Sequence, residues 1–144
     1  MFGPLLLDWR RRRLLRKAPP GPLRDYLATP FPGPGTEWRA VEYLAIDLET
    51  TGLDQRKDAI LSVGHVTLRG GRIELASADH RVVRIAGNIP AASAVIHQIT
   101  DDEAALGEEL PVVLADVLRV LTGKVLIAHY ARVETGFIGR ACRQ

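Results

Sequence analysis

The chain has 144 residues, of which 47% are hydrophobic and 25% charged, and this composition suits one soluble globular domain with its own core. A single cysteine, Cys142, excludes a disulfide framework and a cysteine-rich zinc site. No apolar run approaches the roughly 20 residues that cross a bilayer, and arginines follow the early leucines instead of preceding them, unlike a secretory signal. We therefore expect a cytoplasmic protein without a membrane-spanning segment.

Residues 1–36 are predicted to form a basic N-terminal arm with a Pro/Gly linker. Residues 1–24 contain seven Lys and Arg against one acid, a net charge of +6, whereas residues 25–144 contain 12 bases and 16 acids, a net charge of −4. Residues 5–17 have the irregular amphipathic pattern of a short helix. Such a helix suits docking to a protein partner or weak binding to nucleic-acid phosphates, and the sequence leaves both open.

The domain itself is placed at residues 37–144 and opens with three strands. Residues 39–49 and 59–69 have the composition of strands. Gly70-Gly71 predicts a tight hairpin turn, after which residues 72–85 form the returning strand. Consecutive strands joined by so short a turn pair antiparallel.

The second half of the chain is predicted to be helical around one further short strand. The expected elements are a helical turn at 93–98, a short helix whose Thr100 and Glu103 form a capping box, a helix from Pro111 to about Thr122, a strand at 124–129 and a helix at 131–143. A strand reached through a helical crossover implies a parallel neighbour. The fold class is therefore α/β, with a mixed sheet flanked by helices.

Two carboxylates lie within the first predicted strand, in the stretch A-I-D-L-E-T-T-G-L-D. Asp47 and Glu49 are two residues apart, so their side chains share one face of a strand. Neighbouring carboxylates repel each other, and a divalent cation such as Mg²⁺ or Mn²⁺ removes that repulsion. For an isolated D-x-E pattern, two solvent-exposed acids on a half-exposed strand are the simpler interpretation.

The residues around the two acids favour a specific family. The D-x-E-T-T-G pattern is formed by Asp47, Glu49, Thr50, Thr51 and Gly52. This stretch resembles the first motif of the DnaQ-like (DEDD) 3′–5′ exonucleases, a superfamily that includes the epsilon-type proofreading exonuclease of DNA polymerase III.

Two later segments follow the same family pattern with changes. The segment I-H-Q-I-T at 96–100 is similar to the family's I-H-G-I-T stretch, with Gln98 in place of glycine. His129 and Ala131 match the family's H-N-A-x-F-D motif, and Glu134 stands where the family has an aspartate. Taken without this context, His97 suits a surface histidine at a helix end, and Glu134 suits a surface acid.

The resemblance implies an RNase H-like fold and hydrolysis of phosphodiester bonds at 3′ ends by two Mg²⁺ or Mn²⁺ ions. The expected substrate is the single-stranded 3′ end of DNA or RNA, with DNA favoured. The implied metal ligands and catalytic residues are Asp47, Glu49 and Glu134. The implied substrate-binding residues are Thr50, Thr51, Gly52, His97 and His129.

The family's third motif, H-x-x-x-x-D on a C-terminal helix, does not occur between Glu134 and Gln144. We therefore expect the chain to correspond to roughly the N-terminal two-thirds of such a domain, truncated at its C-terminus, with little turnover by itself. An RNA-trimming exonuclease of the same superfamily is one alternative. A catalytically inactive module that binds nucleic acid or docks to a protein is the other.

Overall fold

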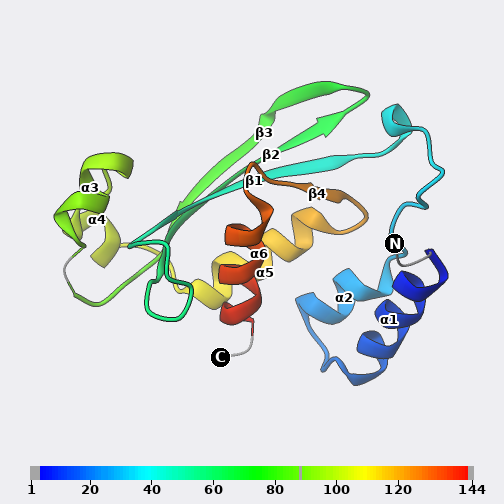
Figure 1. Ribbon diagram of the computed structural model, residues 1–144, viewed down its shortest axis with the longest axis horizontal. Helices are drawn as coiled ribbons and strands as arrows, with labels where there is room; N and C mark the ends of the chain where they lie inside the picture. Colours follow the sequence, from blue (N-terminus) through cyan, green and yellow to red (C-terminus); the bar gives the residue numbers. More distant parts are fainter. Residues whose placement is uncertain (1–3, 88, 143–144) are drawn as a thin grey trace.

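The computed structural model describes residues 4–87 and 89–142, in which a four-stranded sheet is flanked by helices (Figure 1). In chain order the elements are α1 (Pro4–Lys17), α2 (Pro22–Ala28), the 3-10 helix η1 (Trp38–Ala40), β1 (Tyr43–Thr50), β2 (Ile60–Arg69), β3 (Arg72–Val82), α3 (Ala91–His97), α4 (Asp101–Ala105), α5 (Leu110–Leu121), β4 (Val125–Ile127) and α6 (Ala131–Ala141). Among the described residues, no helix combines the length and the apolar character needed to cross a membrane.

The strand order in the sheet is β3-β2-β1-β4. Strands β1, β2 and β3 pair antiparallel, whereas β4 lies parallel to β1, so the predicted mixed sheet is confirmed. The turn between β2 and β3 places Gly70 and Gly71 at φ values of 58° and 78°. Two consecutive positive φ angles favour glycine at both positions, and the predicted tight turn is therefore confirmed.

One face of the sheet is covered by α5 and α6 (Figure 1). The core on this side is formed by Ile46, Ile60, Val63, Val83, Val113, Val117 and Phe137. A second cluster joins α3 and α4 to the sheet and contains Leu61, Ile89, Ile99 and Ala104. The opposite face is more open, because Ile73 and Ile127 on that face keep 59% and 40% of their surface exposed.

Two predicted strand boundaries are wrong for local reasons. The first strand was expected from residue 39, but residues 38–40 form η1, because the Glu37 side chain accepts a hydrogen bond from the Arg39 N–H (2.9 Å). The third strand was expected to reach residue 85, but β3 ends at Val82. Beyond it Val83 N–H still donates to Leu61 O (2.8 Å), but Glu108 becomes a second partner, because Glu108 N–H donates to Val82 O (2.9 Å) and Arg84 N–H donates to Glu108 O (2.7 Å).

The basic arm contains a second helix in addition to the one predicted at residues 5–17. Helix α2 begins at Pro22, directly after Gly21 with φ 137°, which is a helix start typical of proline. It packs against α5 and against α1. Arg11 fixes this α1–α2 hairpin, because its buried guanidinium donates to the Leu27 carbonyl (2.5 Å) and to Asp8 (2.7 and 3.0 Å).

Candidate active site

Strand β1 places Asp47 and Glu49 on the face of the sheet opposite α5 and α6. Asp47 pairs with Gly64 and Glu49 pairs with Ser62 on β2, while Ile46 between them is buried in the core. The Asp47 side chain is exposed and Glu49 is half-buried. The two carboxylates therefore share a solvent-accessible face, as strand alternation requires.

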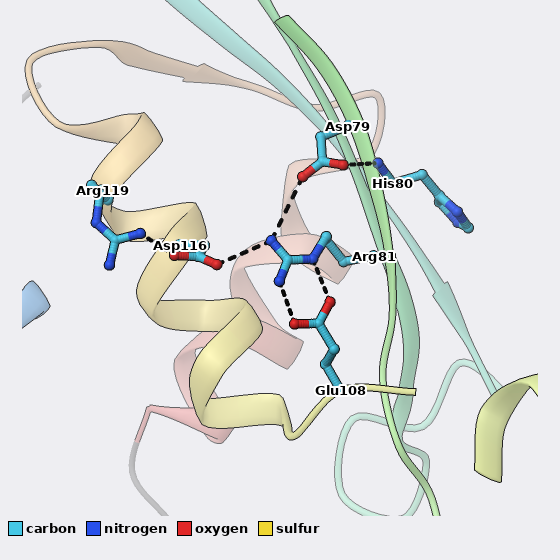
Figure 2. Close-up of polar contacts among 6 residues, drawn as sticks. All are labelled: Asp79, His80, Arg81, Glu108, Asp116 and Arg119. Carbon is cyan, nitrogen blue, oxygen red and sulfur yellow. Dashed lines mark hydrogen bonds and ion pairs between the residues drawn. The ribbon is translucent and has the colours of Figure 1, made fainter. Parts of the chain in front are cut away.

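A histidine without a role in the sequence analysis lies in the same row as Asp47. Gly64 pairs with Asp47 on one side and with His80 of β3 on the other. A Cβ atom at Gly64 would lie 3.9 Å from the Asp47 carbonyl oxygen and 3.9 Å from His80 Cδ2, so the ring leans over the glycine. Figure 2 shows His80 on the side of β3 opposite Arg81.

The position of His80 depends on an irregularity in the hairpin. Near the turn, Thr67 pairs with Glu74, and continuing that register would place Ser77 opposite Gly64. Instead the strand bulges, and Ser77 Oγ accepts a hydrogen bond from Thr67 N–H (2.9 Å) and donates to Glu74 O (2.7 Å). The bulge shifts the register so that His80 lies opposite Gly64. The turn sequence gives no signal for this shift.

The loop after β1 is closed by the Thr51 side chain and backbone. Thr51 N–H donates to Ala59 O (3.0 Å), and Thr51 Oγ1 accepts from Ala59 N–H (3.0 Å) while donating to Asp58 (3.3 Å). A Cβ atom on Gly52 would lie 2.5 Å from the Asp58 carboxylate. Thr51 and Gly52, both expected to bind substrate, therefore have a visible structural role in closing this loop.

The same loop rests on α6. Gln55 Nε2 donates to the Arg132 carbonyl (2.8 Å), and Arg140 Nη1 donates to the Gln55 and Asp58 carbonyls (2.6 and 3.3 Å). A Cβ atom on Gly136 would lie 2.1 Å from the Gln55 side chain, so the glycine makes room for this contact. These contacts hold α6 next to the loop that follows Glu49.

Glu134 lies on the buried side of α6. Glu134 is 5% exposed and lies three residues before the buried Phe137. Its Oε2 atom has no hydrogen-bond partner among the described residues. Burying a carboxylate oxygen without a partner is unfavourable, so this atom has the capacity to accept a cation or a donor. The simpler interpretation of Glu134 as a surface acid does not hold.

The three predicted metal ligands do not converge in this structure. Within the described residues, no group of three or more His, Cys, Asp or Glu side chains is arranged to hold a metal ion. Asp47 and Glu49 lie on the open face, and Glu134 belongs to the helix that packs on the other face. Carboxylate oxygens are suitable ligands for a hard divalent cation, but the three carboxylates are not arranged as a metal site in this structure.

His97 connects α3 to the end of β1. Its Nδ1 atom accepts a hydrogen bond from Ile99 N–H (3.0 Å), and its Nε2 atom pairs with Ser93 Oγ (2.9 Å), which donates to the Thr50 carbonyl (2.7 Å). Because Nδ1 accepts, the neutral ring carries its proton on Nε2. His97 therefore positions the strand end through Ser93. His129 is exposed and lies between β4 and α6.

An ion-pair network on the covered side of β3 supports the same strand. Figure 2 shows Arg81 bound to both carboxylate oxygens of Glu108 and to Asp116 (3.0 Å), with Asp79 at 3.7 Å. The Arg81 guanidinium lowers the pKa of Glu108, and Arg119 together with Arg81 lowers that of Asp116. The network joins β3 to α5 while His80 faces away from it.

A comparison with known families identifies the chain. A family profile described as Exonuclease (RNase_T) matches residues 44–144 and thus contains all eight residues of the predicted site. This chain belongs to that exonuclease family. The predicted relationship to DnaQ-like exonucleases is therefore confirmed.

The related proteins are longer than this chain. The DNA polymerase III subunit epsilon of Treponema pallidum (strain Nichols) is 33% identical over 99 residues, which cover 68% of this chain and 45% of that protein. The PolC-type DNA polymerase III of Thermotoga maritima is 29% identical over 96 residues, which cover 67% of this chain and 7% of that protein. The chain thus spans less than half the length of these relatives.

Solved structures of exonuclease I share the fold. The product-bound structure of exonuclease I has a TM-score of 0.65 and 14% sequence identity, over 72% of this chain and 25% of that chain. The E. coli exonuclease I structure with a dA16 oligonucleotide has a TM-score of 0.64 over 72% of this chain and 24% of that chain, also at 14% identity. The predicted RNase H-like fold is therefore confirmed.

Proposed function

We propose that this domain acts on phosphodiester bonds at nucleic-acid 3′ ends, with single-stranded DNA as the substrate. The observation that carries the proposal is the exposed Asp47 and half-buried Glu49 pair on one face of β1, in a chain of the exonuclease family. DNA is favoured over RNA because the T. pallidum relative is a DNA polymerase III subunit and the E. coli relative was solved with a DNA oligonucleotide.

In this proposal Asp47, Glu49 and Glu134 would hold two divalent cations, Mg²⁺ or Mn²⁺, which would supply an activated water and stabilise charge on the phosphate. Asp47 has the exposure that a substrate-facing ligand needs. Glu134 contributes a carboxylate oxygen with no hydrogen-bond partner among the described residues. Glu134 is buried, whereas Asp47 is exposed and Glu49 is half-buried.

The substrate contacts in this proposal come from the segment around Thr50, Thr51 and Gly52 and from the two histidines His97 and His129. The Thr51 and Gly52 loop lies at the end of β1, and the hydrogen bonds between Thr51 and Ala59 fix its position. His97 acts as a positioning residue through Ser93. His129 is the exposed member of the set and is accessible to a nucleotide.

A metal-free binding module is the alternative function. It is favoured by one observation: no group of three ligating side chains forms within the described part of the chain. A domain of this kind would use the same open face of the sheet to hold nucleic acid without hydrolysing it.

Two measurements on the same protein separate these functions. Mn²⁺ binding is followed by titration calorimetry, and shortening of a 5′-labelled single-stranded DNA is followed on a sequencing gel. We expect Asp47→Asn to weaken Mn²⁺ binding at least about 10-fold and to abolish shortening, and Glu134→Gln to weaken both. The matched control is Asp102→Asn, an exposed acid of α4, which we expect to behave like the wild type.

The outcomes decide between the proposals. Stepwise shortening from the 3′ end that requires both Mn²⁺ and Asp47 supports the exonuclease. A wild-type protein that neither binds Mn²⁺ nor shortens the DNA contradicts catalysis and favours the metal-free module. Shortening that is unchanged in Asp47→Asn contradicts the assignment of the site, because the proposal makes this residue a metal ligand.

A further inference from the structure

We infer that α1 carries a second nucleic-acid contact, a surface that binds the phosphate backbone of single-stranded DNA apart from the site on β1. This surface, the α1 basic face, consists of Arg10, Arg13, Arg16, Lys17 and Trp9. All five side chains are exposed. The inference does not require that the domain hydrolyses its ligand.

Helical spacing brings these residues to one side of α1. Arg10, Arg13 and Lys17 are spaced i, i+3 and i+7, and Trp9, Arg13 and Arg16 are spaced i, i+4 and i+7. In a helix with 3.6 residues per turn, both series run along neighbouring lines of the same face. The face extends about 12 Å along the axis at 1.5 Å per residue, so it presents four cations as a continuous strip.

The structure separates this strip from the other arginines of the R-R-R-R run. Arg11 is buried and bonded to Leu27 and Asp8, and Arg12 pairs with the second oxygen of Asp8 at 2.6 Å. These two guanidiniums hold the pKa of Asp8 below its usual value. The one acid of residues 1–24 is therefore neutralised away from the α1 basic face.

The four cations of the face have no such partners. Arg10, Arg13, Arg16 and Lys17 form no ion pair with acids in the described part of the chain, in contrast to Arg81 and Arg84 of the domain. Because residues 25–144 carry a net charge of −4, the arm supplies the positive potential that a polyanion requires.

An aromatic side chain lies at the N-terminal end of the strip. Trp9 is 52% exposed, and the Arg13 guanidinium carbon lies 5.5 Å from its ring centroid. Surfaces that bind single strands combine cations for the backbone with aromatic rings on which bases stack. The pairing of Trp9 and Arg13 provides both groups at one point of the helix.

A nucleic acid fits this surface better than an anionic membrane does. A membrane-bound basic helix inserts an apolar face that carries its aromatic residues, whereas Trp9 lies among the cations. The side of α1 opposite the strip contacts α2 through the Arg11 and Leu27 hydrogen bond and is not fully available for insertion. The chain also belongs to an exonuclease family, and this membership favours a nucleic acid as the ligand.

The test measures binding of a fluorescein-labelled 16-nucleotide single-stranded DNA by anisotropy, in EDTA so that no metal contributes. The triple variant Arg10→Gln, Arg13→Gln and Arg16→Gln is compared with a variant of equal charge at the hairpin end of the sheet, Arg39→Gln, Arg69→Gln and Arg72→Gln. Each affinity is measured at several salt concentrations, and circular dichroism checks that α1 remains folded.

We expect the α1 variant to bind at least about 10-fold more weakly at low salt, with the slope of log K against log salt reduced by about 2, which is three charges at roughly 0.7 each. The control variant is expected to change the affinity less than about 2-fold. In Trp9→Ala we expect weaker binding with an unchanged slope, because stacking carries no counterion release.

Three results would overturn the inference. Equal losses in the two triple variants would mean that only net charge matters. An α1 variant with wild-type affinity would show that the strip does not touch DNA. Tighter binding of the wild type to phosphatidylglycerol vesicles than to DNA would assign the face to a membrane surface. Because binding is measured in EDTA, where no metal-dependent hydrolysis takes place, the result is independent of whether the domain is an active exonuclease.

Discussion

At the scale of single residues, the acids of the D-x-E-T-T-G stretch have the chemistry of a candidate site, and its threonine and glycine have structural roles. Asp47 and Glu49 lie on the open face of β1 and have the chemistry of cation ligands. Thr51 closes the following loop by hydrogen bonds to Ala59 and Asp58, and Gly52 leaves room for the Asp58 carboxylate. The threonine and glycine of the motif thus fix where the strand ends, and the acids use that position.

Gln98 carries backbone strain that glycine would relieve. It is the residue with positive φ (60°) that is not glycine among the described residues, and it caps the C-terminus of α3. We expect Gln98→Gly to raise the free energy of unfolding by about 0.5–1 kcal/mol, because glycine adopts this left-handed conformation without the steric penalty. Urea unfolding measures the change.

The matched substitution for this prediction is Gln98→Ala, which keeps a Cβ atom and therefore the strain. We expect Gln98→Ala to leave stability nearly unchanged. A destabilised Gln98→Gly protein would mean that the side chain makes a contact that outweighs the strain.

The β2–β3 hairpin decides which residues stand beside Asp47 at the scale of elements. The Ser77 bulge shifts the pairing so that His80 lies in the row of Asp47 and Gly64. On the other side of β3, Arg81 binds Glu108 and Asp116 and thereby joins the strand to α5. Strand β3 thus uses Arg81 to bind α5, and the residue before it, His80, lies beside the candidate site.

Removing the Ser77 hydroxyl tests the role of the bulge. In Ser77→Ala the Thr67 N–H and the Glu74 carbonyl lose their common partner, so we expect a loss of about 1 kcal/mol in the free energy of unfolding. Hydrogen exchange of the Thr67 amide is expected to accelerate, while the amides of β1 keep their protection. Ser77→Thr, which retains the hydroxyl, serves as the control, and an equal loss in both variants would argue against this hydrogen bond.

In the whole molecule, positive and negative charges are concentrated in different regions. The α1–α2 hairpin lies beside α5 on the helix-covered side of the sheet (Figure 1), whereas Asp47 and Glu49 face the opposite side. The acidic domain and the basic arm therefore present two surfaces in different directions. Two of the domain's acids, Glu108 and Asp116, belong to the Arg81 network. They make the stability of the domain depend on pH.

Stability is expected to fall in acid partly through this network. Because the folded-state pKa values of Glu108 and Asp116 are lowered, their contribution is fully present above the ordinary pKa values of 4.5 and 3.8 and is lost as pH decreases through the folded-state values. We expect Arg81→Met to lower Tm at pH 7, and the difference from the wild type to shrink once pH falls below those ordinary pKa values. Thermal unfolding between pH 7 and pH 3 measures both.

A surface ion pair provides the control for the Arg81 prediction. Arg84 binds Glu109 at 2.7 Å, with both side chains more than half exposed. We expect Arg84→Met to change Tm little at any of these pH values, since exposed pairs contribute weakly. A difference between wild type and Arg81→Met that stays constant down to pH 3 would contradict the assigned role of the two carboxylates.

The sequence alone determined those structural features that depend only on residues close together in the chain. Strand alternation places Asp47 and Glu49 on one face, the glycine pair at 70–71 makes the turn, and the capping box of Thr100 and Glu103 starts α4 as predicted. These features follow from local backbone and side-chain geometry, so a short stretch of chain carries enough information to specify them.

The tertiary structure decided what depends on contacts between distant segments. Only packing buries Arg11 while Arg10 stays exposed, and only the bulge in β3 brings His80 into the row of Asp47. The burial of Glu134 away from the β1 pair follows from how α6 lies against the core. The physical reason is that burial and register are set by long-range contacts, which no local pattern of residue types encodes.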